Sequence, residues 1–317
     1  MLVAEAVGQA LARRGPAHVF GLIGSGNFAV SNALVEEGAQ FVAARHECGA
    51  VAMADAYAQV TGGVGMCSVH QGPGLTNTLT ALTEAAKSRT PLVLLAGDTA
   101  ASALRSNFRI EQDQLVRSVG AIAERLHGPQ TAVADALRAL RRARVERRPV
   151  ALMLPLDIQA AECPAGDGAA PEPPSLPPTR PSSEAVSAAV QALARADRPL
   201  IIAGRGAREA HAGALLEELA DVLGGLLATS AVGNGLFASN PWSLGISGGF
   251  ASPSAAELIG QADVVLAAGA TLNMWTTRHA GLLHPRATVI QVDHDPDAIA
   301  AHHRVDIAVI GDVAESA

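Results

Sequence analysis

The sequence predicts an α/β protein with two doubly wound parallel-sheet domains, both Rossmann-like, joined by a Pro-rich linker. Short aliphatic runs alternate with segments whose apolar residues recur at helical spacing, which is typical of parallel strands connected by helices. The alternation stops once, at a segment rich in Pro, Ala and Gly, and then resumes. The chain has 317 residues, enough for two domains, and only 3% of them are aromatic, so the cores must consist mainly of Ala, Val and Leu.

The first alternation begins with a helix in which apolar residues recur every three or four positions. An Ala-rich helix follows later and is ended by Thr61-Gly62-Gly63, since glycine readily takes the left-handed backbone of a helix end. The aliphatic run Pro91–Ala96 reads as a strand buried on both faces. In chain order we expect helix 2–14, strand 18–23, helix 28–36, strand 41–44, helix 47–60, strand 64–69, helix 75–87, strand 91–96, helix 131–147 and strand 149–154.

Composition changes after the last of these strands, where prolines become frequent and the chain is expected to be extended and semi-rigid. We therefore place the first domain at 1–158, the linker at 159–181 and the second domain at 182–317. The second alternation predicts helix 183–195, strand 200–203, helix 207–223, strand 226–229, helix 254–260, and strands 264–268, 289–292 and 307–310.

Charge and cysteine content narrow the class of protein. The net charge of −7 argues against a nucleic-acid or membrane surface as the partner. The three cysteines, Cys48, Cys67 and Cys163, form no Cys-x-x-Cys pair, so no disulfide framework is implied. No apolar run approaches the roughly 20 residues that span a bilayer, and the N-terminus carries no signal-peptide pattern. These features predict a cytoplasmic protein.

Residues that carry chemistry follow the strands of the first domain. Glu47 stands after the second expected strand, and open parallel sheets bind ligands at the carboxyl ends of their strands. Small residues follow Glu47, which lets a helix or a flat ring come close. The ordered motifs are Arg45-His46-Glu47, Ala54-Asp55-Ala56-Tyr57-Ala58, Thr61-Gly62, Gly72-Pro73-Gly74-Leu75-Thr76-Asn77 and Pro91-Leu92-Val93-Leu94-Leu95-Ala96-Gly97.

This ordered set resembles the pyrimidine-binding domain of thiamine-diphosphate-dependent enzymes, with acetolactate synthase the nearest look-alike. The resemblance covers the whole chain, with the pyrimidine-binding domain first and the family's central domain second. It implies that Glu47 is the catalytic glutamate, which hydrogen-bonds a ring nitrogen of the cofactor's aminopyrimidine and promotes deprotonation of its thiazolium carbon. The alternative is a surface Glu at a helix start, stabilised by the helix dipole.

The resemblance implies that two loops bind the cofactor. Gly24 and Gly26 follow the first strand and resemble the family's first active-site loop. The turn Gly72-Pro73-Gly74 would bring backbone close to the ligand, with Asn77 at the next helix. An ordinary strand-to-helix turn is the alternative reading of this segment.

Three residues are candidates for contact with a substrate. His70 and Gln71 replace the small residues expected just before the glycine turn. Gln112 matches a Gln-bearing segment near the family's substrate site. The resemblance implies that these side chains set the polarity of the pocket.

The family's metal site is not found in the sequence. The family binds Mg²⁺, a hard cation that prefers oxygen ligands, with Gly-Asp-Gly followed one helix later by Asn. Gly166-Asp167-Gly168 lies in the Pro-rich linker with no strand before it, so we reject it as that motif. We expect no metal ligand in this chain, an absent diphosphate-binding domain, and thiamine diphosphate whose Mg²⁺ that domain holds. The domain, or a subunit carrying it, is the expected partner, and the lone chain is expected to be inactive.

The second domain is the expected site of a second cofactor, FAD, if this chain binds one. Acetolactate synthases bind FAD there, along Gly-rich loops comparable to Gly204-Arg205-Gly206-Ala207. In this sequence the stretches Thr271–Thr276 and Ser247–Phe250 depart from the family pattern. The departures favour a domain without FAD and leave FAD as the alternative.

The expected function is the pyrimidine-domain half, as a subunit or a fragment, of a thiamine-diphosphate-dependent 2-keto acid decarboxylase or carboligase. Its substrate would be a small 2-keto acid, and the chain would act in a homo- or hetero-oligomer. One alternative is a lyase or decarboxylase without carboligation. Another is a non-catalytic, nucleotide-binding regulatory subunit.

Overall fold

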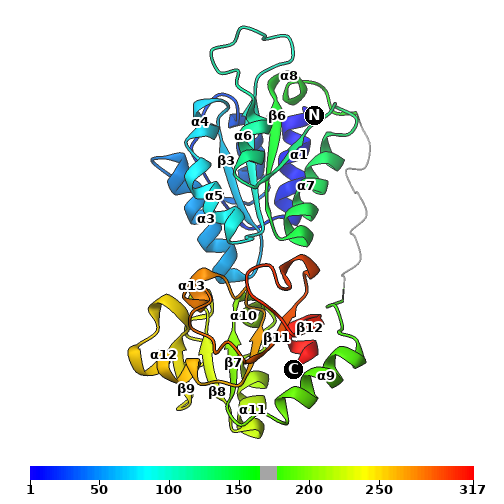
Figure 1. The fold of residues 1–317 in the computed structure, drawn as a ribbon. Coiled ribbons are helices and arrows are strands. Elements are labelled where there is room, and N and C mark those ends of the chain that lie inside the picture. Colours follow the sequence, from blue (N-terminus) through cyan, green and yellow to red (C-terminus); the bar gives the residue numbers. More distant parts are fainter. Residues whose placement is uncertain (165–176) are drawn as a thin grey trace. The chain divides into compact units, whose positions relative to one another are not determined.

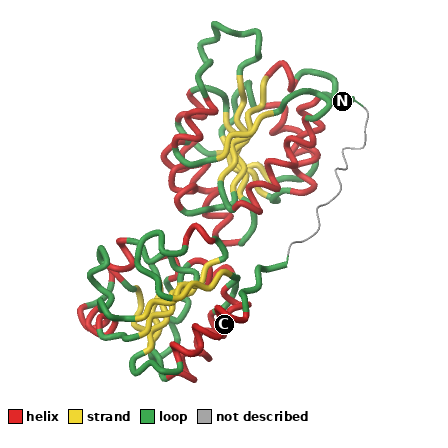
Figure 2. Tube along the Cα trace, turned by 45° about the vertical axis from the view of Figure 1, so that its right-hand side comes forward, coloured by secondary structure: helices red, strands yellow, loops and turns green. Residues whose placement is uncertain are grey.

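The computed structural model describes residues 1–164 and 177–317, and the chain divides into two compact units between Pro173 and Pro174. Each unit has a parallel sheet of six strands with helices on both faces (Figure 1 and Figure 2). This confirms the predicted fold class. The rejected motif Gly166-Asp167-Gly168 lies outside the described residues.

The first sheet has the strand order β2-β1-β3-β4-β6-β5. Because β1 has β2 on one side and β3 on the other, the strand order reverses beside β1. Open α/β sheets bind ligands at such a switch point, outside the carboxyl ends of the strands. The strands are β1 His18–Gly21, β2 Gln40–Ala43, β3 Gly65–Val69, β4 Leu92–Asp98, β5 Ile122–Arg125 and β6 Pro149–Pro155.

Helices cover the two faces of this sheet in separate sets. The apolar residues of α1, α2 and α7 pack on one face, and those of α3, α5 and α6 on the other. Along β4 the side chains alternate between the two cores, with Val93 and Leu95 in one and Leu92 and Leu94 in the other, all fully buried. The helices are α1 Val3–Arg14, α2 Phe28–Glu36, α3 Glu47–Thr61, α4 Pro73–Thr76, α5 Leu79–Lys87, α6 Gln112–Ser118, α7 Ala132–Glu146 and α8 Leu156–Gln159.

The expected helix 75–87 is wrong as one element, because the structure divides it into α4 and α5. Threonine hydroxyls on this segment donate to carbonyl oxygens one turn back, Thr76 to Pro73 and Thr78 to Leu75. Such contacts compete with regular helix hydrogen bonds. The sequence pattern also missed α6 and β5, which lie in a polar stretch without clear periodicity.

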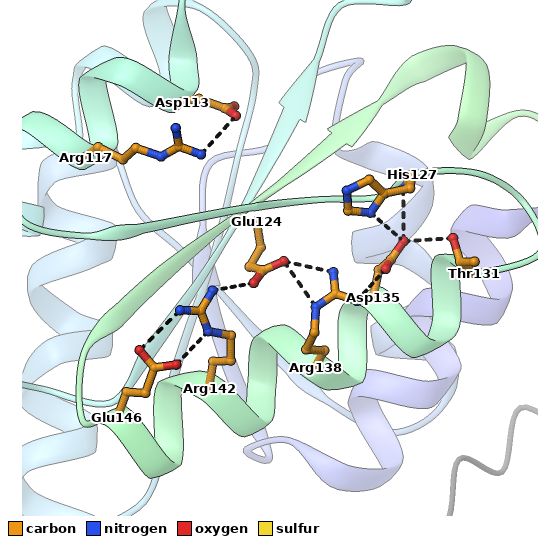
Figure 3. Close-up of polar contacts among 9 residues, drawn as sticks. All are labelled: Asp113, Arg117, Glu124, His127, Thr131, Asp135, Arg138, Arg142 and Glu146. Carbon is orange, nitrogen blue, oxygen red and sulfur yellow. Dashed lines mark hydrogen bonds and ion pairs between the residues drawn. The ribbon is translucent and has the colours of Figure 1, made fainter.

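The edge strand β5, which pairs with β6, is attached to α7 by ion pairs between charged side chains (Figure 3). Glu124 on β5 accepts hydrogen bonds from Arg138 and Arg142 of α7. Arg138 also donates to Asp135, which accepts from the backbone N–H of His127. Arg138 and Arg142 are thus paired with carboxylates on this helix face.

The second sheet has the order β12-β11-β10-β7-β8-β9. Its strands are β7 Pro199–Ala203, β8 Leu226–Thr229, β9 Ser243–Ile246, β10 Val264–Ala268, β11 Thr288–Asp293 and β12 Ile307–Ile310. Its helices are α9 Ser183–Leu193, α10 Arg205–Glu209, α11 Gly213–Leu223, α12 Pro253–Gly260, α13 Met274–Thr277 and α14 Val313–Ser316, with short 3₁₀ turns at Ala231–Gly233, Gly248–Phe250 and Pro296–Ala298.

The expected helix 207–223 is also wrong as one element. It is interrupted between α10 and α11, where His211 has a φ of 52°. A left-handed residue of this kind cannot continue a right-handed helix. The edge strand β9 was missed, since its side chains are only half-buried and its sequence shows no aliphatic run.

Within the described residues, the structure contains no helix with both the length and the apolar character needed to cross a membrane.

Candidate active site

The loops after β1 and β3 meet at the switch point of the first sheet. The backbone N–H of Gly26 donates to Nδ1 of His70 over 3.0 Å. Within the first loop, the Gly24 N–H donates to the side chain of Asn27, which in turn donates to Ser68 of β3. The loop is therefore held against the end of β3 by two adjacent residues, Gly26 and Asn27.

Glu47 is the first residue of α3 and only 8% exposed. His46, the residue before the helix, caps it, because its ring accepts a hydrogen bond from the Cys48 N–H. One carboxylate oxygen of Glu47, Oε2, accepts a hydrogen bond of 2.9 Å from the side-chain amide of Asn77. The other oxygen, Oε1, accepts none from any residue that the structure describes. The predicted catalytic residue and the predicted cofactor residue Asn77 are thus in direct contact.

Gly74 separates Glu47 from His70. A Cβ atom placed on Gly74 would lie 3.6 Å from Oε1 of Glu47 and 3.0 Å from Cβ of His70. Burial lowers the pKa of His70, and the negative charge of Glu47 opposes this in part. The backbone of Gly74 is itself buried and lies between the carboxylate and the imidazole, where a glycine adds no Cβ to crowd either group.

The turn before Gly74 is held by Gln112. Gly72 has a φ of 62°, which favours glycine, and a Cβ here would lie 2.7 Å from the carbonyl oxygen of Phe108. Its N–H donates to Oε1 of Gln112 over 2.8 Å, and Nε2 of Gln112 donates to the Gly97 carbonyl. Pro73 follows as the first residue of α4, where its missing N–H costs nothing.

The three predicted substrate residues differ in their surroundings. His70 is half-buried at the junction of the loops. Gln112 is 2% exposed, and both ends of its amide bind backbone. Gln71 is 3% exposed, and its Oε1 has no hydrogen-bond partner among the described residues. The structure brings all three to the same edge of the sheet, where His70 is the most exposed and Gln112 is fully engaged with backbone.

Two residues near the site escaped the sequence reading. Gln159, at the end of α8, donates from Nε2 to the carbonyl oxygens of Gly26 and Leu154. Phe108 packs its ring edge-on to His70, with ring centres 4.9 Å apart. As the one aromatic residue between positions 97 and 118, Phe108 offered a weak signal. Gln159 offered none, because it lies at the start of the Pro-rich stretch.

The Gly-rich loop of the second unit has a packing role. A Cβ on Gly204 would lie 2.1 Å from the carbonyl oxygen of Gly269, and one on Gly206 would lie 2.8 Å from Cα of Gly269. The Gly206 N–H donates to that same carbonyl. Close backbone contact between the loops after β7 and β10 therefore accounts for these glycines without a ligand.

In the two described ranges, no group of three or more His, Cys, Asp or Glu side chains could hold a metal ion.

Comparison with known families gives matches over both units. The N-terminal thiamine pyrophosphate (TPP)-binding domain of thiamine pyrophosphate enzymes matches residues 1–118. The central domain of the same enzymes matches residues 186–317.

Curated relatives include a probable 2-ketoarginine decarboxylase of Pseudomonas aeruginosa, which is 34% identical over 98% of this chain and 56% of its own length. A sulfoacetaldehyde acetyltransferase of Rhodobacter capsulatus is 32% identical over 98% of this chain and 53% of the relative. The large subunit of acetolactate synthase isozyme 3 of Escherichia coli is 32% identical over 98% of this chain and 55% of its own length. The chain thus spans about half the length of the curated relatives it matches.

Proposed function

The chain belongs to the thiamine pyrophosphate enzyme family, and from this premise we propose that it forms the pyrimidine-binding and central domains of a 2-keto acid decarboxylase or carboligase resembling acetolactate synthase. The observation that carries the proposal is the state of Glu47. Its carboxylate is buried, oriented through Oε2 by Asn77, and free at Oε1 beside a glycine.

These residues fit the aminopyrimidine ring of thiamine diphosphate. A ring nitrogen needs a single carboxylate oxygen as its hydrogen-bond partner, and Oε1 of Glu47 is such an atom. Gly74 has no Cβ beside Oε1, so no side chain at that position crowds this oxygen. Gly72 and Pro73 place backbone at the same edge, and Gly24 and Gly26 form the facing loop. We assign cofactor contact to these glycines, Pro73 and Asn77.

Each side chain has a distinct part in the proposed chemistry. When bound, the cofactor supplies the carbanion chemistry that a keto acid needs for loss of CO₂. Glu47 holds or releases a proton at Oε1, and Asn77 fixes its carboxylate by donating to Oε2. His70 faces the substrate, while Gln71 and Gln112 hold the walls of the pocket.

The diphosphate and its Mg²⁺ would be held elsewhere. Magnesium prefers carboxylate and other oxygen ligands around a nearly octahedral ion, and the described residues hold no such cluster. We propose that a diphosphate-binding domain, as part of a larger protein or as a separate subunit, completes the site. The complete site would lie in a homo- or hetero-oligomer, which we place in the cytoplasm.

The relatives favour different outcomes for the reaction. The probable 2-ketoarginine decarboxylase, by its name, releases CO₂ from a keto acid. Likeness to the acetolactate synthase subunit favours carboligation instead. Product analysis with pyruvate separates the two, since carboligation yields a longer keto acid and simple decarboxylation yields an aldehyde. A nucleotide-binding regulatory subunit would yield neither product.

The first prediction tests Glu47 in the holoenzyme, assembled with the diphosphate-binding domain, Mg²⁺ and thiamine diphosphate. Glu47→Gln should slow proton–deuteron exchange at the thiazolium carbon by about 100-fold or more, since general acid–base groups contribute about 10²–10⁴-fold. Exchange is followed by NMR after acid quench. Glu36→Gln, on the exposed face of α2, serves as the matched control.

Unchanged exchange in Glu47→Gln would contradict the assignment of this residue. Calorimetric titration of the chain alone with thiamine diphosphate and Mg²⁺ tests the shared site separately. Weak binding is expected, because the diphosphate has no metal anchor in the described residues. Tight binding together with keto acid turnover by the 317 residues alone would contradict the need for another domain.

We further propose that the second unit binds no FAD, because its glycines are occupied by mutual packing and two flavin-contacting stretches differ from the family pattern. The purified chain should be colourless. Stoichiometric flavin released on denaturation would overturn this part of the proposal.

A further inference from the structure

His70 is held by a backbone donor rather than by an acid. Its Nδ1 accepts the Gly26 N–H at 3.0 Å. The loop lies so close to this edge of the ring that a Cβ on Gly26 would be 2.8 Å from Nδ1, and one on Gly24 would be 3.0 Å from it. Only glycines leave room for this contact, which fixes Nδ1 toward the loop.

The contact determines which nitrogen carries the proton. A backbone N–H can only donate, so Nδ1 must present a lone pair. A neutral imidazole carries one N–H, which must then be on Nε2. Protonation of both nitrogens would place two N–H groups against each other. Burial also favours the neutral ring, because it lowers the pKa of His70, although the charge of Glu47 partly opposes this effect.

The protonated nitrogen is open to a ligand. No hydrogen bond joins Nε2 of His70 to any residue in the described parts of the chain. Within those parts, the buried side-chain atoms that lack a partner are His18 Nδ1, Gln71 Oε1 and Ser230 Oγ. Since Nε2 of His70 is not among them, it is accessible. Phe108, at a ring angle of 76°, packs against the imidazole and limits its rotation.

We propose that His70 is a neutral hydrogen-bond donor, locked in the Nε2–H tautomer by Gly26, which binds an oxygen atom of the 2-keto acid. The proposal rests on the proposed function for its substrate, while the tautomer rests on the Gly26 contact alone. In this role His70 takes up no proton. It stabilises negative charge on a carboxylate or carbonyl oxygen of the substrate.

The tautomer can be measured on this chain without cofactor or partner. Long-range ¹H–¹⁵N correlation spectra of protein labelled at histidine distinguish the two neutral tautomers and the cation. The His70 signals are assigned by their loss in His70→Gln. We expect an Nε2–H tautomer at neutral pH. An Nδ1–H tautomer or a cation at that pH would overturn the proposal, whatever the function of the protein.

Two variants test the donor in the holoenzyme. His70→Asn can place its amide oxygen near the position of Nδ1, which keeps the Gly26 contact but removes the donor. His70→Gln can reach the position of Nε2 with its amide N–H. Loss of one preorganised donor to a developing oxyanion typically lowers kcat by about 10²–10³-fold.

We therefore expect His70→Asn to lose about 10²–10³-fold in kcat/KM for the keto acid, and His70→Gln to keep about a tenth of the activity or more. Thiamine diphosphate affinity should be unchanged in both. Equal losses in the two variants, or full activity in His70→Asn, would contradict the donor role. Failure of the proposed function appears differently, as unchanged exchange in Glu47→Gln.

Discussion

Gln112 shows how one buried side chain joins two loops at the site. Its Oε1 accepts from Gly72 and its Nε2 donates to Gly97, so it links the turn after β3 to the end of β4. The resemblance to the family suggested contact with substrate. The hydrogen bonds point instead to a positioning role, in which Gln112 holds the glycine turn in place beside Glu47.

Replacing Gln112 should therefore affect stability. Gln112→Ala leaves a buried N–H and a buried carbonyl without partners, and each such group costs about 1–3 kcal/mol. We expect the free energy of unfolding, measured by urea denaturation, to fall by about 3 kcal/mol. Gln114→Ala, on the exposed side of the same helix, should change it by about 0.5 kcal/mol or less. A loss no larger than that of Gln114→Ala would contradict the positioning role.

Gln112→Glu adds a pH-dependent test of the same contacts. A protonated carboxyl can accept from Gly72 and donate to Gly97, whereas a carboxylate would face the Gly97 carbonyl. Burial should raise the folded-state pKa of this carboxyl above its usual value. The stability deficit relative to wild type should then be small below the unfolded pKa of about 4.3 and grow as pH rises through the folded pKa. A deficit independent of pH would count against this account.

At the scale of elements, β5 is attached to α7 by charged side chains (Figure 3) as well as by apolar packing, in which Ile122 shares a core with the apolar face of α7. Burial alone would raise the pKa of Glu124, but hydrogen bonds and positive charge from Arg138 and Arg142 outweigh it and hold the pKa below its ordinary value. The pKa of Asp135 is also lowered, because the His127 N–H, Arg138 and Thr131 outweigh its burial. Both carboxylates are therefore more stable as anions in the folded protein.

Glu124→Gln should lower the free energy of unfolding by about 1–2 kcal/mol at neutral pH, since breaking a buried pair is costly but both arginines remain partly exposed. A group with a depressed folded pKa stabilises above its unfolded pKa and loses that effect as pH falls through the folded value. The difference from wild type should therefore shrink as pH falls below the ordinary pKa of about 4.3 and disappear only below the depressed folded pKa of Glu124.

Glu146→Gln is the matched control, because Glu146 also pairs with Arg142 but is 39% exposed. It should cost about 0.5 kcal/mol or less at any pH. Thermal unfolding across pH measures all three proteins. If Glu146→Gln destabilised the protein as much as Glu124→Gln, burial of Glu124 would not be the deciding factor.

At the scale of the whole molecule, each unit has its own cores on both faces of its own sheet. In the second unit, β7 places Ile201 in one core and Ile202 in the other, both fully buried. A domain of this size can bury enough apolar surface to fold independently. We therefore expect each unit to fold on its own.

Residues 177–317 expressed alone should accordingly unfold in one cooperative transition in urea, followed by circular dichroism and fluorescence together. Ile201→Asp places a charge in the core and should abolish that transition. Val222→Asp, at a side chain 80% exposed on α11, should leave it nearly unchanged. A gradual transition, or different midpoints from the two probes, would contradict independent folding.

The sequence by itself determined the fold class, most element positions and the location of Glu47 after a strand. These features depend on local periodicity and on glycines at helix ends, such as Gly62 after α3. Both signals involve residues that are close together in the sequence. Helices 75–87 and 207–223 were misread as single elements because side-chain hydroxyls and one left-handed residue interrupt a continuous apolar pattern.

Only the tertiary structure decided which residues act together. Asn77 contacts Glu47 across 30 positions, Gly26 contacts His70 across 44, and Gln159 contacts Gly26 across 133. Such hydrogen bonds depend on strand order and register, which bring the carboxyl ends of distant strands to one edge. For this reason the sequence could nominate Gln112 and His70, while the structure alone showed that one is bound to backbone and the other has a donor free for a ligand.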